Sequence, residues 1–287
     1  MNKSNVFVLY HGSCTDGLGA KYAAWKTFGD EGANYIPVYY GEIPPKELNS
    51  SSEVYILDFS YPRRVLVALQ GLCASVVVLD HHKTAQADLE GLEGCTFNMA
   101  KSGCVLAWEY FHPGVPVPRL LEHIQDRDLW AWKLNGTKEI CKAIPSMLED
   151  MGQWDSVCFG GEESTNFTLG YLWRSGIVIC ALDDLKIKSM LKRVRVVNFC
   201  GHKTGIINAT EFASEIGNAI CMDSSLDVEL ALVYNITKDN TVAVSLRSVG
   251  EFDVSVIAKK FSGGGHKNAS GCSLPIETLL QILKESY

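Results

Sequence analysis

The chain has 287 residues, of which 47% are hydrophobic and 21% are charged, an ordinary composition for a globular protein long enough to form two domains. Its formal net charge of −7 excludes a whole-molecule basic field that would gather duplex DNA or an anionic membrane, so phosphate must be met locally. The longest apolar stretches are shorter than the roughly 20 residues of a membrane helix, the N-terminus lacks a signal-peptide pattern, and the ten cysteines are scattered, so we expect a cytoplasmic protein with reduced thiols.

The first half of the chain alternates strand patterns with helical patterns. Continuously apolar, β-branched runs, which a parallel sheet buries on both faces, lie at residues 5–10, 54–59 and 75–80. Amphipathic helical patterns follow them at residues 17–29, 62–72 and 102–112. This alternation predicts βαβ units and a parallel sheet.

Farther along, strand patterns fade between about Val115 and Val194, where helical patterns such as 119–134 and 182–194 take over. Strand patterns return at residues 204–209, 228–236 and 241–249, among helical patterns at 211–220, 254–261 and 275–286. We therefore predict an α/β protein in three parts. These are an N-terminal parallel-sheet domain (1–135), a helical connector (136–195) and a smaller C-terminal α/β domain (196–287).

Polar side chains gather at the ends of the three early strands. Because the carboxyl ends of neighbouring parallel strands meet at one crevice, we expect these side chains to reach the same place. Imidazoles and carboxylates together suit Mn²⁺, with Fe²⁺, Co²⁺ or Mg²⁺ as alternatives, and two ions that share a carboxylate suit in-line attack on phosphorus. The residues concerned are His11, Asp16, Asp58, Asp80, His81 and His82.

Four short segments together resemble the DHH/DHHA1 phosphoesterase superfamily, and most closely its nanoRNase or oligoribonuclease-like branch. They are "DGLGA" after the first strand, "LDFS" after the second, "LDHH" ending the third, and "GGGHKNASG" near the C-terminus. The match runs from about Val6 to Gly271. It implies that the N-terminal part is a DHH catalytic domain and the C-terminal part a DHHA1 substrate-binding domain.

The resemblance also implies a role for each clustered residue. The segment "IQDRDLW" supplies a further metal ligand, for which the similar "DRDLW" branch favours Asp126, whereas Asp128 would be a local partner of Arg127. For the other residues, the implied roles are the first metal motif for His11 and Asp16, the bridging ligand for Asp58, orientation of a ligand for Asp80, metal ligation for His81, and contact with the substrate phosphate for His82.

Position 14 departs from the family pattern, because many members have an aspartate where this chain has Cys14. A thiolate binds softer ions more tightly but does not reproduce a hard bidentate carboxylate. Three interpretations stay open. Cys14 completes an unusual first metal site, or that site is weak and one ion held by Asp16, Asp58, His81 and Asp126 carries the chemistry, or Cys14 only packs.

The run "FSGGGHKNASG" has three consecutive glycines, whose entropic cost argues against a helix or a regular strand. We expect the N–H groups of Gly263, Gly264 and Gly265, together with His266, to form a nest for a phosphate. The resemblance adds Arg247 and Ser248 as further phosphate-binding residues.

These observations predict a metal-dependent phosphodiesterase that hydrolyses short oligonucleotides or small, including cyclic, nucleotides. A hydroxide made on one or two Mn²⁺ ions would attack phosphorus, while His82 and the ions stabilise charge on the phosphoryl oxygens. The alternatives are a phosphomonoesterase or pyrophosphatase on pAp-like or inorganic substrates, and a non-catalytic nucleotide sensor. Neither duplex DNA nor a membrane is an expected partner, and the oligomeric state, including a homodimer, stays open.

Overall fold

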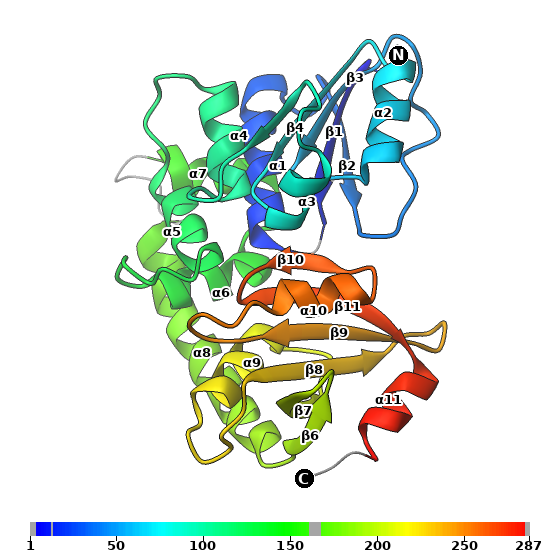
Figure 1. The fold of residues 1–287 in the computed structure, drawn as a ribbon. Helices are drawn as coiled ribbons and strands as arrows, with labels where there is room; N and C mark the ends of the chain where they lie inside the picture. Colours follow the sequence, from blue (N-terminus) through cyan, green and yellow to red (C-terminus); the bar gives the residue numbers. More distant parts are fainter. Residues whose placement is uncertain (1–3, 13, 161–167, 285–287) are drawn as a thin grey trace. The chain divides into compact units, whose positions relative to one another are not determined.

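The computed structural model describes residues 4–12, 14–160 and 168–284 (Figure 1). The chain forms two compact units, residues 1–181 and 182–287. Each unit has its own sheet and its own hydrophobic core, so the α/β architecture that the sequence predicts is confirmed. The predicted boundaries at residues 135 and 195 stay predictions.

The first unit is built on a five-stranded, fully parallel sheet with the strand order β2-β1-β3-β4-β5. Its central strands are apolar on both faces because both faces are covered, as parallel sheets require. Val8, Val54 and Val78 are completely buried. The strands are β1 (Val6–His11), β2 (Asn34–Val38), β3 (Glu53–Leu57), β4 (Ser75–Asp80) and β5 (Cys95–Phe97).

Helices cover the two faces of this sheet (Figure 1). Alternate residues of β1 enter different cores: Val8 packs with residues of α1 and α4, whereas Leu9 packs with Leu66 and Leu69 of α2, as the two-residue period of a strand dictates. The helices are α1 (Thr15–Phe28), α2 (Arg63–Leu72), α3 (Lys83–Asp88), α4 (Gly103–Phe111), α5 (Arg119–Asp128), α6 (Thr137–Met147) and α7 (Met151–Phe159), followed by the long α8 (Leu169–Leu191), which runs on into the second unit.

The start of α1 lies unusually close to the end of β1. A side chain at Gly17 would place its Cβ 2.0 Å from the carbonyl oxygen of His11, so only glycine allows the helix to begin there. The Cys14 side chain caps this helix, since its Sγ accepts a hydrogen bond from the Gly17 N–H at 3.3 Å. Gly17, the first glycine of "DGLGA", therefore allows His11 and the first turn of α1 to lie close together.

The second unit is a six-stranded mixed sheet with the order β10-β11-β9-β8-β7-β6, in which β7 and β8 are parallel and the other neighbours antiparallel. Alternating residues of β9, such as Val242, Val244 and Leu246, enter its core. The elements are β6 (Arg195–Phe199), β7 (His202–Asn208), α9 (Ala213–Met222), β8 (Leu230–Ile236), β9 (Thr241–Arg247), α10 (Val254–Lys260), β10 (Gly264–His266), β11 (Ala269–Pro275) and α11 (Ile276–Ile282).

The glycine run forms a hairpin strand, so the expectation that it avoids regular structure is wrong. Gly264–His266 is the edge strand β10 and pairs with β11. A Cβ at Gly263 would lie 2.1 Å from the Gly271 carbonyl oxygen, and Gly265 has a φ of 137°, which L-residues with side chains rarely adopt. At least two of the three glycines are thus required by the packing of the chain on itself.

Among the helices in the described part of the chain, none combines the length and the apolar character that crossing a membrane requires.

Candidate active site

The ends of β1, β3 and β4 bring donor side chains of the first unit together, as the sequence predicts. His11 is the last residue of β1, Asp58 directly follows β3, and Asp80 ends β4 ahead of His81. Ligand atoms of these residues form groups in which every atom lies within 4.8 Å of the others. The local reason is the parallel register, which aligns all three carboxyl ends at one edge of the sheet.

Asp58 lies between two groups of donors and presents one carboxylate oxygen to each. Its Oδ1 is 3.2 Å from His81 Nε2, and its Oδ2 is 3.1 Å from Cys14 Sγ and 3.5 Å from His11 Nδ1. The residue is 1% exposed and has a left-handed φ of 54°, a strained conformation that proteins retain mainly at functional sites. Its geometry is that of a carboxylate able to bridge two cations.

The first donor group consists of Asp16, His81 and Asp128, and Asp58 adjoins it through its 3.2 Å contact with His81. The Nε2 atom of His81 lies 3.6 Å from Asp16 Oδ2 and 3.4 Å from Asp128 Oδ2. The N-terminus of α4 fixes Asp16, because the N–H groups of Gly103 and Cys104 donate to its two oxygens at 2.6 and 3.0 Å, the favourable place for a carboxylate.

Asp126 does not join this group, so its ligand role stays a prediction from the sequence that these distances do not support. Its carboxylate accepts hydrogen bonds from Lys133 N at 2.7 Å, Leu134 N at 3.0 Å and Thr137 Oγ1 at 2.7 Å. Two residues along an α-helix differ by roughly 200° in direction, so Asp126 and Asp128 point to different sides of α5. The structure places Asp128 at the position expected of Asp126.

The second donor group consists of His11, Cys14 and Asp58. The Cys14 thiol donates to Asp58 Oδ2 at 3.1 Å and lies 3.4 Å from His11 Nδ1. With the His11–Asp58 separation of 3.5 Å, the three ligand atoms form a nearly equilateral triangle. Edges of this length match three ligands at the 2.0–2.3 Å bond lengths typical of a transition metal, so Cys14 has more than a packing contact here.

Asp80 holds His82 in one orientation and is itself fully occupied by hydrogen bonds. Its Oδ1 accepts from the N–H groups of His81 and His82 and lies 2.6 Å from His82 Nδ1, while its Oδ2 accepts from Ser60 Oγ at 2.6 Å. Burial raises the Asp80 pKa, but its donors outweigh burial and bring it to about 2. Burial lowers the His82 pKa, and Asp80 outweighs it and raises it to about 9, so His82 is a cation at neutral pH.

In the second unit, the structure separates the candidates Arg247 and Ser248. Ser248 is buried, donates its hydroxyl proton to the Phe252 carbonyl at 2.7 Å and accepts from Asn268 at 2.9 Å, contacts that tie two loops together and argue against a phosphate role. Arg247 donates to Ser214 Oγ at 2.9 Å and to the Leu246 carbonyl at 2.8 Å. A guanidinium has five N–H donors, so these contacts leave it the capacity to bind an anion.

The predicted phosphate nest loses one of its members. The Gly263 N–H donates to the Ala258 carbonyl at 2.9 Å and is thus used within the chain. Gly264, Gly265 and His266 form β10 at the edge of the sheet. Their role in binding stays a prediction, now resting on an edge strand instead of an irregular loop.

Comparison with known proteins identifies the family of this chain. The family model of the DHHA1 domain matches residues 203–286, and two relatives align with 94% and 98% of the chain. The chain belongs to the DHH/DHHA1 phosphoesterase superfamily. It is therefore a phosphoesterase, a hydrolase, as the sequence predicts.

The relatives of this DHH/DHHA1 protein come from distant organisms. The uncharacterized protein R106 of Acanthamoeba polyphaga mimivirus is 34% identical over 297 residues, covering 94% of this chain and 68% of R106. The oligoribonuclease NrnB of Bacillus subtilis is 24% identical over 322 residues, covering 98% of this chain and 76% of NrnB. The structure of RecJ from Thermus thermophilus, solved with Mn²⁺, matches the fold with a TM-score of 0.52 at 15% identity, over 98% of this chain and 51% of RecJ.

The donor set of the DHH domain fits a divalent metal ion. Burial and the charges of Asp58 and Asp128 raise the pKa of Asp16 well above its ordinary value. Burial lowers the pKa of His81, but the hydrogen bond that its ring donates to Asp58 and the charges of the neighbouring carboxylates raise it to about 10. Carboxylates that recruit a proton onto an imidazole would equally recruit a cation. Oxygen and imidazole donors suit Mn²⁺, Fe²⁺, Co²⁺ or Mg²⁺.

Gly103 and Tyr40 are site residues that sequence reasoning missed. A Cβ at Gly103 would lie 2.4 Å from Asp58 Cβ, so only glycine allows α4 to approach the bridging residue. The available signal was "SG" at the start of the apolar helix, because Ser102 at the N-cap is typical of a helix start. The ring of Tyr40 lies 5.4 Å from that of His11 and 6.2 Å from that of His82, and the residue is 60% exposed.

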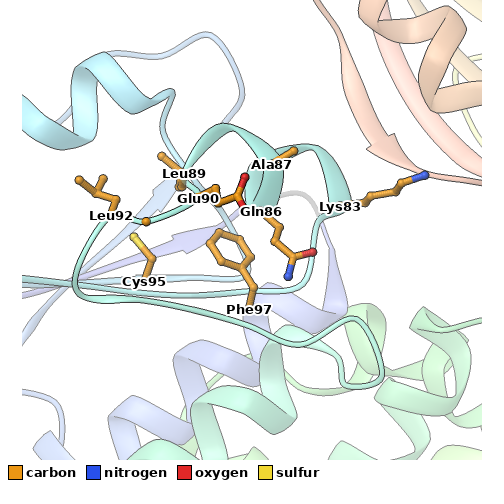
Figure 2. A pocket seen from close by; sticks show the side chains of 9 residues that line it. Lys83, Gln86, Ala87, Leu89, Glu90, Leu92, Cys95 and Phe97 are labelled. Carbon is orange, nitrogen blue, oxygen red and sulfur yellow. The ribbon is translucent and has the colours of Figure 1, made fainter.

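A separate hollow of about 540 Å³ opens beside α3 and β5, lined by residues between Lys83 and Phe97. Figure 2 shows the Gln86 amide beside the Phe97 ring, with Cys95 and Leu92 farther along. None of its lining residues belongs to either donor group, so it is distinct from the candidate metal site.

Proposed function

We propose that this phosphoesterase is a metal-dependent phosphodiesterase that hydrolyses short oligonucleotides. The observation that carries the proposal is Asp58, whose two oxygens face two separate groups of donors at 3.1–3.5 Å. Paired ions about 3.5–4 Å apart that share such a carboxylate are typical of enzymes that cleave phosphate esters.

The first ion would be held by Asp16, Asp58, His81 and Asp128, and the second by His11, Cys14 and Asp58. When bound, divalent ions lower the pKa of water and neutralise charge on the phosphoryl oxygens. Of the ions considered, the second group favours softer ones because it includes a thiolate. The first group, with carboxylates and one imidazole, suits Mn²⁺.

The residues around this centre supply the remaining chemistry. His82, with its pKa of about 9, keeps a positive charge at neutral pH and would offset the charge that develops on the phosphoryl oxygens. Asp80 fixes the imidazole through Nδ1, which directs Nε2 away from Asp80. Hydrolysis forms one phosphorus–oxygen bond from water and breaks another to the leaving nucleoside oxygen, which takes up a proton.

Short oligonucleotides are the substrates that the charge and the relatives favour. The net charge of −7 gives no attraction that grows with strand length, and NrnB is named an oligoribonuclease. The DHHA1 domain would anchor a remote phosphate through Arg247 and β10. Anchoring of this kind converts binding energy into orientation of the scissile bond.

The test is the rate of hydrolysis of ribonucleotides of two to ten residues, cyclic dinucleotides, pAp and pyrophosphate with Mn²⁺, Co²⁺ or Mg²⁺. We expect kcat/KM to be highest for two to five residues. The variant Asp58→Asn should lose about 10³-fold or more, because it removes the shared charge, while its thermal unfolding stays close to wild type. Rates that rise steadily with strand length, or pAp and pyrophosphate as the best substrates, would refute the proposal.

A further inference from the structure

The segment that follows α5 displays two tryptophans to solvent. Trp130 is 40% exposed and Trp132 39% exposed. Their rings meet edge to face, with centroids 4.9 Å apart and planes at 75°. Tryptophan is highly buried on average, so two adjoining exposed tryptophans form an apolar surface that needs an explanation.

Both tryptophans have a strained backbone. Their φ angles are 55° and 52°, in the left-handed region that bulky residues rarely occupy. Such strain persists only where the surroundings impose it, and it gathers at active sites and ligand clamps. The chain thus maintains an unfavourable conformation that exposes two large apolar rings.

Asp126 imposes this conformation from the end of α5. Its backbone carbonyl accepts the Ala131 N–H at 2.8 Å, and its carboxylate accepts the N–H groups of Lys133 and Leu134 and the hydroxyl of Thr137. The tryptophan pair is fixed before any ligand arrives, which reduces the entropic cost of binding.

The same segment begins beside the candidate metal site. Asp128, the last residue of α5, has its Oδ2 3.4 Å from His81 Nε2. Trp130 is two residues farther on, so its Cα lies within about 7.6 Å of the Asp128 Cα. Arg127 holds the helix end in place through its Nη1, 3.4 Å from Thr15 Oγ1 in the first turn of α1.

We infer that Trp130 and Trp132 form a stacking platform for a nucleobase of the substrate, next to the phosphate that is cleaved. This inference rests on the proposed function. An aromatic side chain stacks on the flat face of a base, and every base has such a face. The platform would therefore prefer nucleotides to inorganic phosphates, whatever the base sequence. Asp126 is the positioning residue of the platform, which accounts for its separation from Asp128.

The test compares a dinucleotide with the same dinucleotide in which one base at a time is replaced by hydrogen. For the wild type, at one of the two positions, we expect kcat/KM to be about 5- to 100-fold higher with the base than without it, which is the range that stacking of one base provides. The difference should lie mainly in KM. Trp130→Ala and Trp132→Ala should each reduce that preference, and Trp130→Phe should restore part of it. Tyr110→Ala is the control, because Tyr110 is an exposed aromatic residue of the same unit that packs on Tyr55 and Phe111 instead of on the tryptophan segment.

The outcomes distinguish this inference from the proposed function. A base preference unchanged in both alanine variants, or equal losses on base-bearing and base-free substrates, would overturn the inference. A wild type that cleaves neither substrate would overturn the proposed function alone. In that case, tryptophan fluorescence in an Asp58→Asn background still tests the platform. The inference requires that the dinucleotide quenches the fluorescence, that the base-free dinucleotide does not, and that Trp130→Ala weakens the quenching.

Discussion

The two units of this protein are built around different kinds of polar groups. In the DHH domain, buried carboxyl and imidazole groups lie at three strand ends and in the first turn of α1, and Asp16 and Asp58 are almost inaccessible to solvent. In the DHHA1 domain, the candidate phosphate-binding region is a glycine strand at a sheet edge together with one arginine. Side chains thus build the candidate cation site, whereas backbone shape dominates the candidate anion site.

This difference decides what a substitution does in each unit. Replacing a donor in the DHH domain removes one ligand and leaves the backbone in place. Adding a Cβ at Gly263 brings it within 2.1 Å of a backbone oxygen, so a change there disturbs the hairpin before it disturbs binding. The experiments below therefore use side-chain substitutions in both units.

After Asp58→Asn, the largest effect should come from Asp128→Asn. It removes a carboxylate 3.4 Å from His81, and we expect a loss of about 10²-fold or more in kcat with a lower affinity for Mn²⁺. The matched variant is Asp126→Ala, which leaves donors without an acceptor and should lower the free energy of unfolding by about 1–3 kcal/mol. Hydrolysis kinetics, Mn²⁺ titration and thermal unfolding distinguish the two.

The pair of variants would contradict the structural assignment if their effects were exchanged. Asp126→Ala would then weaken Mn²⁺ binding at unchanged stability, while Asp128→Asn would leave Mn²⁺ affinity intact.

An intermediate effect is expected for His266→Ala in the DHHA1 domain. If β10 anchors a remote phosphate, kcat/KM for a short oligonucleotide should fall about 10- to 100-fold, while slow hydrolysis of bis(p-nitrophenyl) phosphate changes little because it has no remote group. His202→Ala is the control, since His202 is a half-buried histidine of the same unit that pairs with Glu229 at 3.1 Å. Equal losses on both substrates would show that His266 serves the fold or the chemistry instead of anchoring.

The smallest effect concerns which ion the second donor group prefers. Cys14→Asp exchanges a soft donor for a hard one, so the ratio of Mn²⁺ to Co²⁺ affinity should rise by about tenfold. Calorimetric titration measures this ratio, and the near-ultraviolet absorption of a thiolate–Co²⁺ bond should disappear in the variant. An unchanged ratio, with no such band in the wild type, would reduce Cys14 to its role as the cap of α1.

The DHH domain was more predictable than the DHHA1 domain for a physical reason. Strand ends in a parallel sheet converge by geometry alone, so His11, Asp58 and His81 could be placed together from the hydrophobic pattern. The choice between Asp126 and Asp128 needed the exact end of α5, which the pattern extended to residue 134 but the structure ends at Asp128. The two carboxylates point to different sides of α5, and the sequence alone does not show which side faces the strand ends.

The glycine run shows the opposite case. Consecutive glycines indicate that another group lies close to the backbone, but the sequence does not tell which group. Here Gly263 and Gly265 lie against residues of β11. The role of Ser248 stays a prediction, and the sequence could not show that its hydroxyl binds Phe252 and Asn268, because these partners lie in separate loops.

In evolutionary terms, Asp58 and Gly103 have to be inherited together. The left-handed backbone at residue 58 is tolerated best by glycine, asparagine and aspartate, and of these only aspartate supplies a carboxylate. Any side chain at residue 103 would have its Cβ 2.4 Å from that of Asp58. Single mutational steps at either position are therefore closed while the centre is under selection, and diversification of substrate range has to proceed through the exposed residues around it, such as Tyr40 and the Trp130–Trp132 segment.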